Sequence, residues 1–366
     1  LPFLQSVPLV IVVNAVFAFA IASVGPVVTM LVVEDAPESA WNSRIARLNK
    51  FQGYGGMFGL VVGAFWMVGV SSILSAGTTQ QSLFIVAAFF GIASAMLATR
   101  WLPRRASLDV GPRRSDRVAT SLARTNRNIR DATFSFGMAR FFWAFKSLSG
   151  GRFGMLRREF PRALVIYFVA SFFFFTGFGV FWAPLPLYLR NAGFSSGAIF
   201  GIYLVNTIGS AALFDVAAKY CDKHDIRFVQ GGALGTRAFS FLGIGLLGVV
   251  GSRFLTGDIL VPLVVVGLFI TLVGVTWAFI AVTGTAIVSR ISSPQTRGGI
   301  LGIYAALAAI ASALGSLTGG WLASQTFTYA FIASFILVIS GAFIVVAARQ
   351  ISSATVNHAR ISGSSD

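Results

Sequence analysis

The chain has 366 residues, of which 56% are hydrophobic and only 11% are charged. A soluble domain carries about 25% charged residues, so this chain has too few charges to cover a surface that faces water. The net charge of +16 would suit a nucleic-acid-binding protein. However, the basic residues lie between apolar runs that are nearly free of charge, which is typical of a membrane protein.

Residues that could carry catalysis are scarce. Cys221 is the single cysteine, which excludes an internal disulfide, and the two histidines, His224 and His358, lie outside the apolar runs. No cluster of His, Glu and Cys in the sequence could hold a metal or activate a nucleophile, and no nucleotide-binding loop is present. We therefore expect no catalytic residue, no metal, no cofactor and no enzymatic activity.

Apolar runs divide most of the chain into membrane-spanning helices. A bilayer core about 30 Å thick needs about 20 apolar residues in a helix. The runs are too long for strands and lack their alternation, so we predict an all-α membrane protein. Nine spans are predicted, at 7–33, 51–73, 82–102, 162–189, 195–218, 229–251, 258–289, 298–322 and 326–348.

The Lys and Arg residues alternate between the two sides of these spans. Of the 28, 25 fall on one side and 2 on the other, while Arg237 lies within a span. Basic loops remain in the cytoplasm. We therefore predict a multi-pass protein of the cell (plasma) membrane, with the loop 103–161 and the tail 349–366 in the cytoplasm.

Three spans precede the long loop and six follow it. Residues 1–102 then form a partial N-terminal transmembrane half, and residues 162–348 form a complete C-terminal half. Transporters are commonly built from two six-helix halves joined by a cytoplasmic loop. We therefore hypothesise that three further helices precede Leu1 in the parent protein.

The long loop is expected to bind lipid. Residues 100–162 carry 15 basic and 4 acidic residues, and residues 133–148 combine aromatic and basic side chains as an interfacial amphipathic helix does. Basic segments bind anionic leaflets. The predicted partner is therefore the inner leaflet and not nucleic acid.

Three motifs resemble the major facilitator superfamily. The glycine-rich run 52–63 is similar to the fifth helix of that family, and the start of the span 298–322 is similar to the eleventh. The loop 218–227 resembles a second copy of the family's Gly-x-x-x-Asp-Arg-x-Gly-Arg-Arg loop. The resemblance implies a major facilitator-type helical bundle in which the first three spans are the fourth to sixth of twelve.

The same loop supplies a candidate conformational latch. Asp222, Lys223 and Arg227 stand at matching positions of the loop motif. The resemblance implies that such an acid pairs with basic groups and helix ends to hold the outward-facing state. A solvated turn is the alternative.

Glycines in the span 51–73 predict a packing face. Gly55, Gly59 and Gly63 recur every four residues, so they share one side of a helix. Without Cβ atoms there, two backbones can approach closely. The face would serve tight packing and could also serve as a sliding seam between the halves.

Two ionisable residues fall inside the apolar runs. Asp215 lies near the end of the span 195–218, and Arg237 lies two turns into the next span. Charged groups in a span usually pair or serve function, so we predict an ion pair or a coupling role for these residues.

Six residues are candidates for substrate binding. The resemblance implies that the spans 162–189 and 258–289 line a central cavity, where large aromatic side chains could stack on a solute. Polar side chains in apolar runs need partners in lipid, which either cavity lining or helix-to-helix hydrogen bonds would supply. The candidates are Asn14, Phe178, Trp182, Asn206, Trp277 and Tyr304.

These features predict a secondary active or facilitative transporter that moves a small, weakly polar solute by alternating access. The alternatives are a transport-inactive sensor or scaffold of the same fold and, less well supported, a membrane-embedded enzyme. Proton coupling stays open, because Asp215 is the one candidate carboxyl in the spans and it lies far from the midplane.

Overall fold

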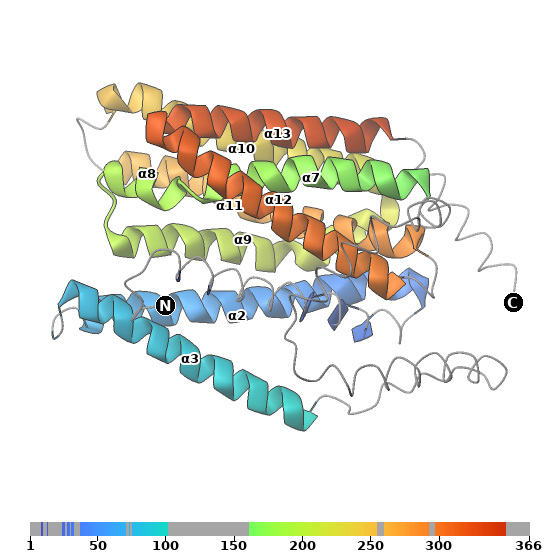
Figure 1. Ribbon diagram of the computed structural model, residues 1–366, viewed down its shortest axis with the longest axis horizontal. Coiled ribbons are helices and arrows are strands. Elements are labelled where there is room, and N and C mark those ends of the chain that lie inside the picture. The colour runs from blue at the N-terminus through green and yellow to red at the C-terminus, as the bar shows by residue number, and fades with distance from the viewer. Residues whose placement is uncertain are drawn as a thin grey trace, which may run out of the picture. The chain divides into compact units, whose positions relative to one another are not determined.

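The computed structural model describes residues 37–70, 73, 75–101, 161–254, 260–292 and 297–348, together with isolated positions between 9 and 32. Within these residues every regular element is a helix (Figure 1). The chain forms two compact units. The first joins Leu1–Phe84 to Arg162–Asp366, and the second is Ile85–Pro161.

The helices follow one another with short connections. They are η1 (Glu38–Ala40), α2 (Trp41–Val70), α3 (Ala76–Trp101), α7 (Arg162–Trp182), α8 (Leu185–Asn191), α9 (Ser196–Lys223), α10 (Ile226–Phe254), α11 (Leu260–Ile291), α12 (Arg297–Gln325) and α13 (Phe327–Ala347).

Seven helical segments are long and apolar enough to cross a membrane. They are α2, the Gln81–Arg100 part of α3, the α7–α8 pair, α9, α11, α12 and α13. The 29-residue α10 is not one of the seven. The predicted span 7–33 lies outside the described residues except at isolated positions, as do the segment 133–148 and the tail 349–366. The all-helical prediction is confirmed for the described residues, whereas the count of nine spans is not.

Two predicted boundaries differ from the structure for identifiable reasons. Helix α2 begins at Trp41 instead of residue 51, because Arg44, Arg47 and Lys50 interrupt the apolar run without interrupting the helix. The span predicted at 162–189 is broken after Trp182. Pro184 stands at that break, and proline cannot donate the backbone hydrogen bond that would continue α7.

The reversal from α8 into α9 is fixed by local chemistry. Gly193 has a φ of 87°, the left-handed conformation that ends many helices. Its N–H donates to the Arg190 carbonyl at 3.0 Å, and the N–H of Phe194 donates to the Leu189 carbonyl at 3.1 Å. The Ser195 hydroxyl then caps α9 by accepting from the Ala198 N–H at 3.2 Å.

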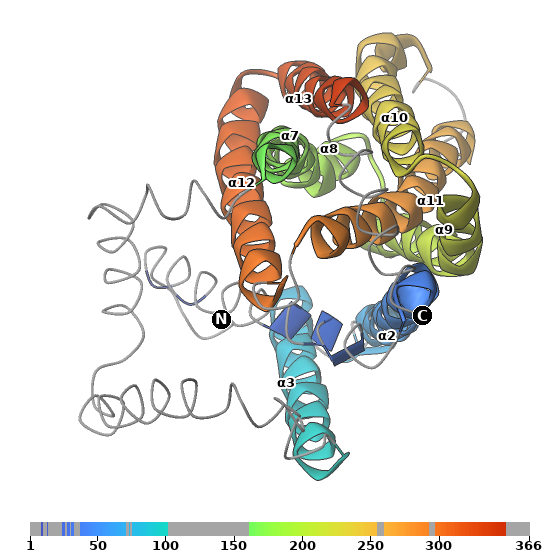
Figure 2. The same cartoon turned by 90° about the vertical axis from the view of Figure 1, so that its right-hand side faces the viewer.

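In the first unit, α7 packs against α12 and α13, α10 packs against α11 and α13, and α9 packs against α11 and α2 (Figure 2). Helix α7 supplies much of the buried core through Tyr167, Phe174 and Phe181, which are 0% exposed. Close approach of α7 and α12 needs glycine at position 315, since a Cβ there would overlap the backbone oxygen of Thr176.

Candidate functional site

A seam between α2 and α9 joins a helix that precedes the long loop to one that follows it. The two helices lie side by side in both views (Figures 1 and 2). A Cβ placed on Gly53 would lie 2.9 Å from the Ala211 Cβ, and one on Gly56 would lie 3.4 Å from Thr207 Cγ2. We call this contact the α2–α9 seam.

The seam uses a different glycine face from the predicted one. Of the predicted set, Gly63 faces α9, where an added Cβ would lie 3.2 Å from the Phe200 ring. An added Cβ on Gly55 or Gly59 would meet no atom within 4 Å. With 3.6 residues per turn, positions 53, 56 and 63 fall on one side of α2, which the four-residue spacing alone does not reveal.

Two polar contacts cross the seam towards the end that carries the α9–α10 turn. Lys50 Nζ donates to Asp215 Oδ2 at 2.5 Å, and Asn42 Nδ2 donates to Asp222 Oδ1 at 2.6 Å. Between these two contacts, Ala46 packs into an apolar cluster with residues of α9, α10 and α11. The seam is therefore polar at two points and apolar between them.

Solvent reaches these two contacts to different extents. The side chains of Lys50 and Asp215 are 28% and 53% exposed, so water and salt screen their ion pair. Asn42 is 0% exposed, and its Oδ1 atom has no hydrogen-bond partner. The inner contact can therefore break at little cost, whereas release of Asp222 would leave a buried amide unsatisfied.

The three candidate latch residues have separate partners. Asp222 reaches across the seam to Asn42, whereas Lys223 is exposed. Arg227 is held within its own turn, where its Nη2 donates to Asp225 Oδ2 at 2.7 Å. Of the three, Asp222 alone connects α9 with α2 through a printed contact in the described part of the chain.

The structure does not bring Asp215 and Arg237 together. Asp215 pairs with Lys50, while Nη1 of Arg237 donates to the Val273 carbonyl of α11 at 3.2 Å. The reason is the side of the helix each residue occupies: Asp215 faces α2 and is exposed, whereas Arg237 is 3% exposed within the bundle.

Arg237 is enclosed by aromatic rings from three helices. Its Cζ atom lies 4.3 Å from the ring centroid of Phe178 on α7, 5.5 Å from that of Trp277 on α11 and 5.6 Å from that of Phe241 on α10. Cation–π contacts contribute roughly 0.5–2 kcal/mol each, which offsets part of the cost of burying a guanidinium. We call this arrangement the Arg237 cage.

Two of the candidate substrate residues belong to the Arg237 cage. Phe178 is 5% exposed and meets Trp277 edge to face at 6.4 Å between ring centroids. Tyr304 of α12 is linked to them through Phe175, whose ring lies 5.9 Å from Tyr304 and 5.7 Å from Phe178. A continuous aromatic surface therefore extends from α12 through α7 to α11.

The other three candidates lie apart from the cage. Trp182 packs on Tyr203 of α9 at 5.5 Å between centroids. Asn206 donates from Nδ2 to the Ile270 carbonyl at 3.0 Å, a hydrogen bond between α9 and α11. Asn14 falls outside the described residues. The alternatives of cavity lining and helix-to-helix bonding are thus resolved only at Asn206, in favour of the second.

Sequence reasoning did not single out Lys50, Asn42, Tyr167 or Gln230. The first two were assigned to a loop, because the predicted span began too late. Gln230 is 0% exposed and donates from Nε2 to the Tyr167 hydroxyl at 2.8 Å, and its Oε1 has no partner. A glutamine in an apolar run was the available signal.

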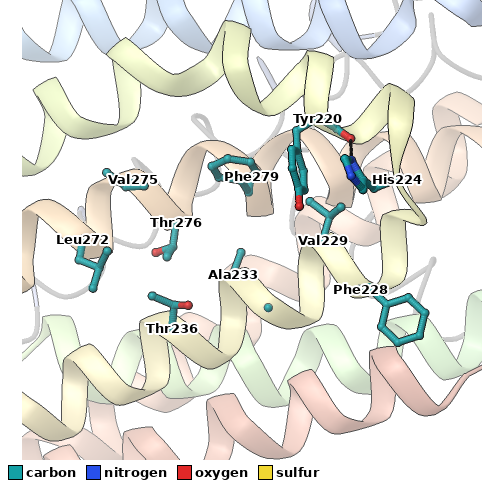
Figure 3. Close-up of a pocket in the computed structure, with 11 residues that line it drawn as sticks. Tyr220, His224, Phe228, Val229, Ala233, Thr236, Leu272, Val275, Thr276 and Phe279 are labelled. Atoms are coloured by element: carbon teal, nitrogen blue, oxygen red, sulfur yellow. Dashed lines mark hydrogen bonds between the residues drawn. The ribbon is translucent and has the colours of Figure 1, made fainter.

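A cavity of about 360 Å³ lies between α9 and α10, with α11 behind it (Figure 3). Its wall is mostly apolar, with Thr236 and Thr276 at one end and the stacked rings of Tyr220 and His224 at the other. The chain neighbours Arg237 and Trp277 are not among its lining residues, so the cavity and the Arg237 cage are separate. No group of three or more His, Cys, Asp or Glu side chains placed to hold a metal occurs in the described residues.

Long apolar helices with buried charge and close interhelical seams define a multi-pass helical membrane protein. The sequence matches the profile of the Major Facilitator Superfamily over residues 1–281 of its 366. The chain belongs to this superfamily of membrane transporters, which confirms the resemblance seen in its motifs. No protein in a search of curated sequences matches the chain.

Proposed function

We propose that the chain transports a small, weakly polar solute by alternating access, and that the α2–α9 seam is a contact that opens and closes in each cycle. The observation that carries this proposal is the pair of contacts Lys50–Asp215 and Asn42–Asp222, which tie together segments from the two sides of the long loop. Alternating access requires such contacts to form in one state and break in the other.

The proposed latch is located at one end of the seam. The distribution of Lys and Arg places the α9–α10 turn in the cytoplasm. Contacts at that end would then close the cytoplasmic side and favour the outward-facing state. The small residues at Gly53 and Gly56 would let α2 slide over α9 without large side chains obstructing the movement.

The aromatic surface is the proposed lining of the solute pathway. Phe178, Trp277 and Tyr304 come from α7, α11 and α12, and the rings form one series of contacts. Flat apolar side chains with few charges suit a solute that has a ring or a hydrocarbon body. Asp215 is the proposed site of any proton coupling, through its pair with Lys50.

Double electron–electron resonance tests the movement directly. Spin labels on Arg44→Cys and Lys219→Cys, both exposed, would report the distance between α2 and α9, with Cys221→Ser as background. We expect two distance populations, and Asp215→Asn combined with Asp222→Asn should increase the longer one. Asp225→Asn is the matched control, since its pair with Arg227 stays within one turn. A single narrow population that neither seam substitution alters would refute the proposal.

A further inference from the structure

The side chain of Arg237 is a buried cation with no counter-ion among the described residues. The two ion pairs of the described residues are Lys50–Asp215 and Arg227–Asp225. Asp222, the remaining acid of the α9–α10 region, is bonded to Asn42. The predicted span 7–33, which lies largely outside the described residues, contains no Asp or Glu. A fixed positive charge in a span without an acid is rare and usually marks a function.

The hydrogen-bonding capacity of this guanidinium is largely unused. A guanidinium has five N–H donors in a planar fork. Arg237 Nη1 donates to the Val273 carbonyl, and its Nε atom is buried with no partner. The Thr276 hydroxyl donates to the same carbonyl at 2.9 Å, so that acceptor is shared as well. The unpaired donors match what a carboxylate accepts from arginine.

The walls of the Arg237 cage suit a flat apolar body beside the charge. Phe178 and Phe241 are 5% and 0% exposed, whereas Trp277 is half-buried. Trp277 is therefore the wall that has room to move, and its displacement would open the guanidinium to a ligand. Phe178 would remain as a stacking surface that continues through Phe175 towards Tyr304.

We propose that Arg237 binds the anionic group of the transported solute, and that this solute is a small organic monocarboxylate with a flat apolar body held between Phe178 and Trp277. The inference rests on the proposed transport function and narrows its substrate class: one negative charge that Arg237 neutralises leaves the remainder of the solute weakly polar. Trp277 covers the site when it is empty.

Benzoate and benzamide test this site, because they have nearly the same shape and differ in charge. Binding is measured on the purified full chain in detergent by thermal shift and by tryptophan fluorescence. We expect benzoate to bind at least about tenfold more tightly than benzamide, since a charge-assisted fork is available to it alone. Equal responses of the wild-type protein to the two compounds would overturn the proposal without any substitution.

Two variants then assign the preference to Arg237. Arg237→Gln should reduce the benzoate-to-benzamide ratio to about one, and Arg237→Lys should give an intermediate ratio because it keeps the charge and loses the fork. Arg190→Gln, at an exposed position on α8, is the matched control and should keep the wild-type ratio. A benzoate preference that persists in Arg237→Gln would also overturn the proposal. Because binding in detergent needs no movement of the seam, it fails or succeeds separately from the spin-label test.

Discussion

The α2–α9 seam and the Arg237 cage solve the problem of polar groups in an apolar protein in opposite ways. At the seam, small residues face each other and the ion pair is partly open to solvent, at 28% and 53% exposure. In the cage, large rings enclose a cation that is 3% exposed. Contacts of the first kind break at little cost, whereas those of the second resist separation. The comparison teaches that movement and fixed chemistry occupy different parts of this bundle.

The largest expected effect breaks close packing in the same rigid region as the cage. Gly315→Ala would place a Cβ against the backbone oxygen of Thr176, which cannot rotate away. We expect destabilisation of about 3 kcal/mol or more, at the upper end for overpacked sites, seen as a lower melting temperature in detergent. Gly302→Ala on the same helix has open space and serves as control. Equal melting temperatures for the two variants would contradict the α7–α12 contact.

A smaller effect of opposite sign is expected within the cage itself. Arg237→Met replaces a buried cation without a counter-ion by an apolar side chain of similar length. Such replacements are often neutral or stabilise by about 1–4 kcal/mol. We expect Arg237→Met to raise the melting temperature while it removes the benzoate preference. Arg190→Met, which is exposed, should change neither quantity. A large loss of stability in Arg237→Met would instead indicate that the cage is chiefly structural.

The comparison also shows how far the sequence could predict these two regions. The membrane helices, the special position of Arg237 and the cage residues Phe178 and Trp277 follow from composition, charge and the family resemblance. The partners of Asp215 and Arg237 do not follow, because the side each residue faces depends on how the helices are rotated about their axes. Gly55 and Gly59 were predicted at a packing face for the same reason, yet they meet open space.

A further, smaller effect is expected at the ion pair of the seam. Lys50→Gln and Asp215→Asn should each increase the fraction of separated α2 and α9 by about threefold at most, since the pair is screened by solvent. The double variant should change the fraction no further than the larger single change, and high salt should reduce each effect. The spin-label distance distribution measures the fractions. Strictly additive effects in the double variant would show that the two side chains do not act through each other.

The smallest effect distinguishes the glycine face that packs from the one that does not. Gly53→Ala would bring a new methyl group within 2.9 Å of the Ala211 Cβ, which a shift of a few tenths of an ångström would relieve. Gly55→Ala, two positions along α2, meets nothing within 4 Å. Both substitutions gain the same helix propensity, so their difference isolates the contact with α9. We expect Gly53→Ala alone to lengthen the α2–α9 spin-label distance and to favour the separated population. If Gly55→Ala produced the same change, α2 would have to be rotated about its axis, and the seam with its two polar contacts would be wrongly placed.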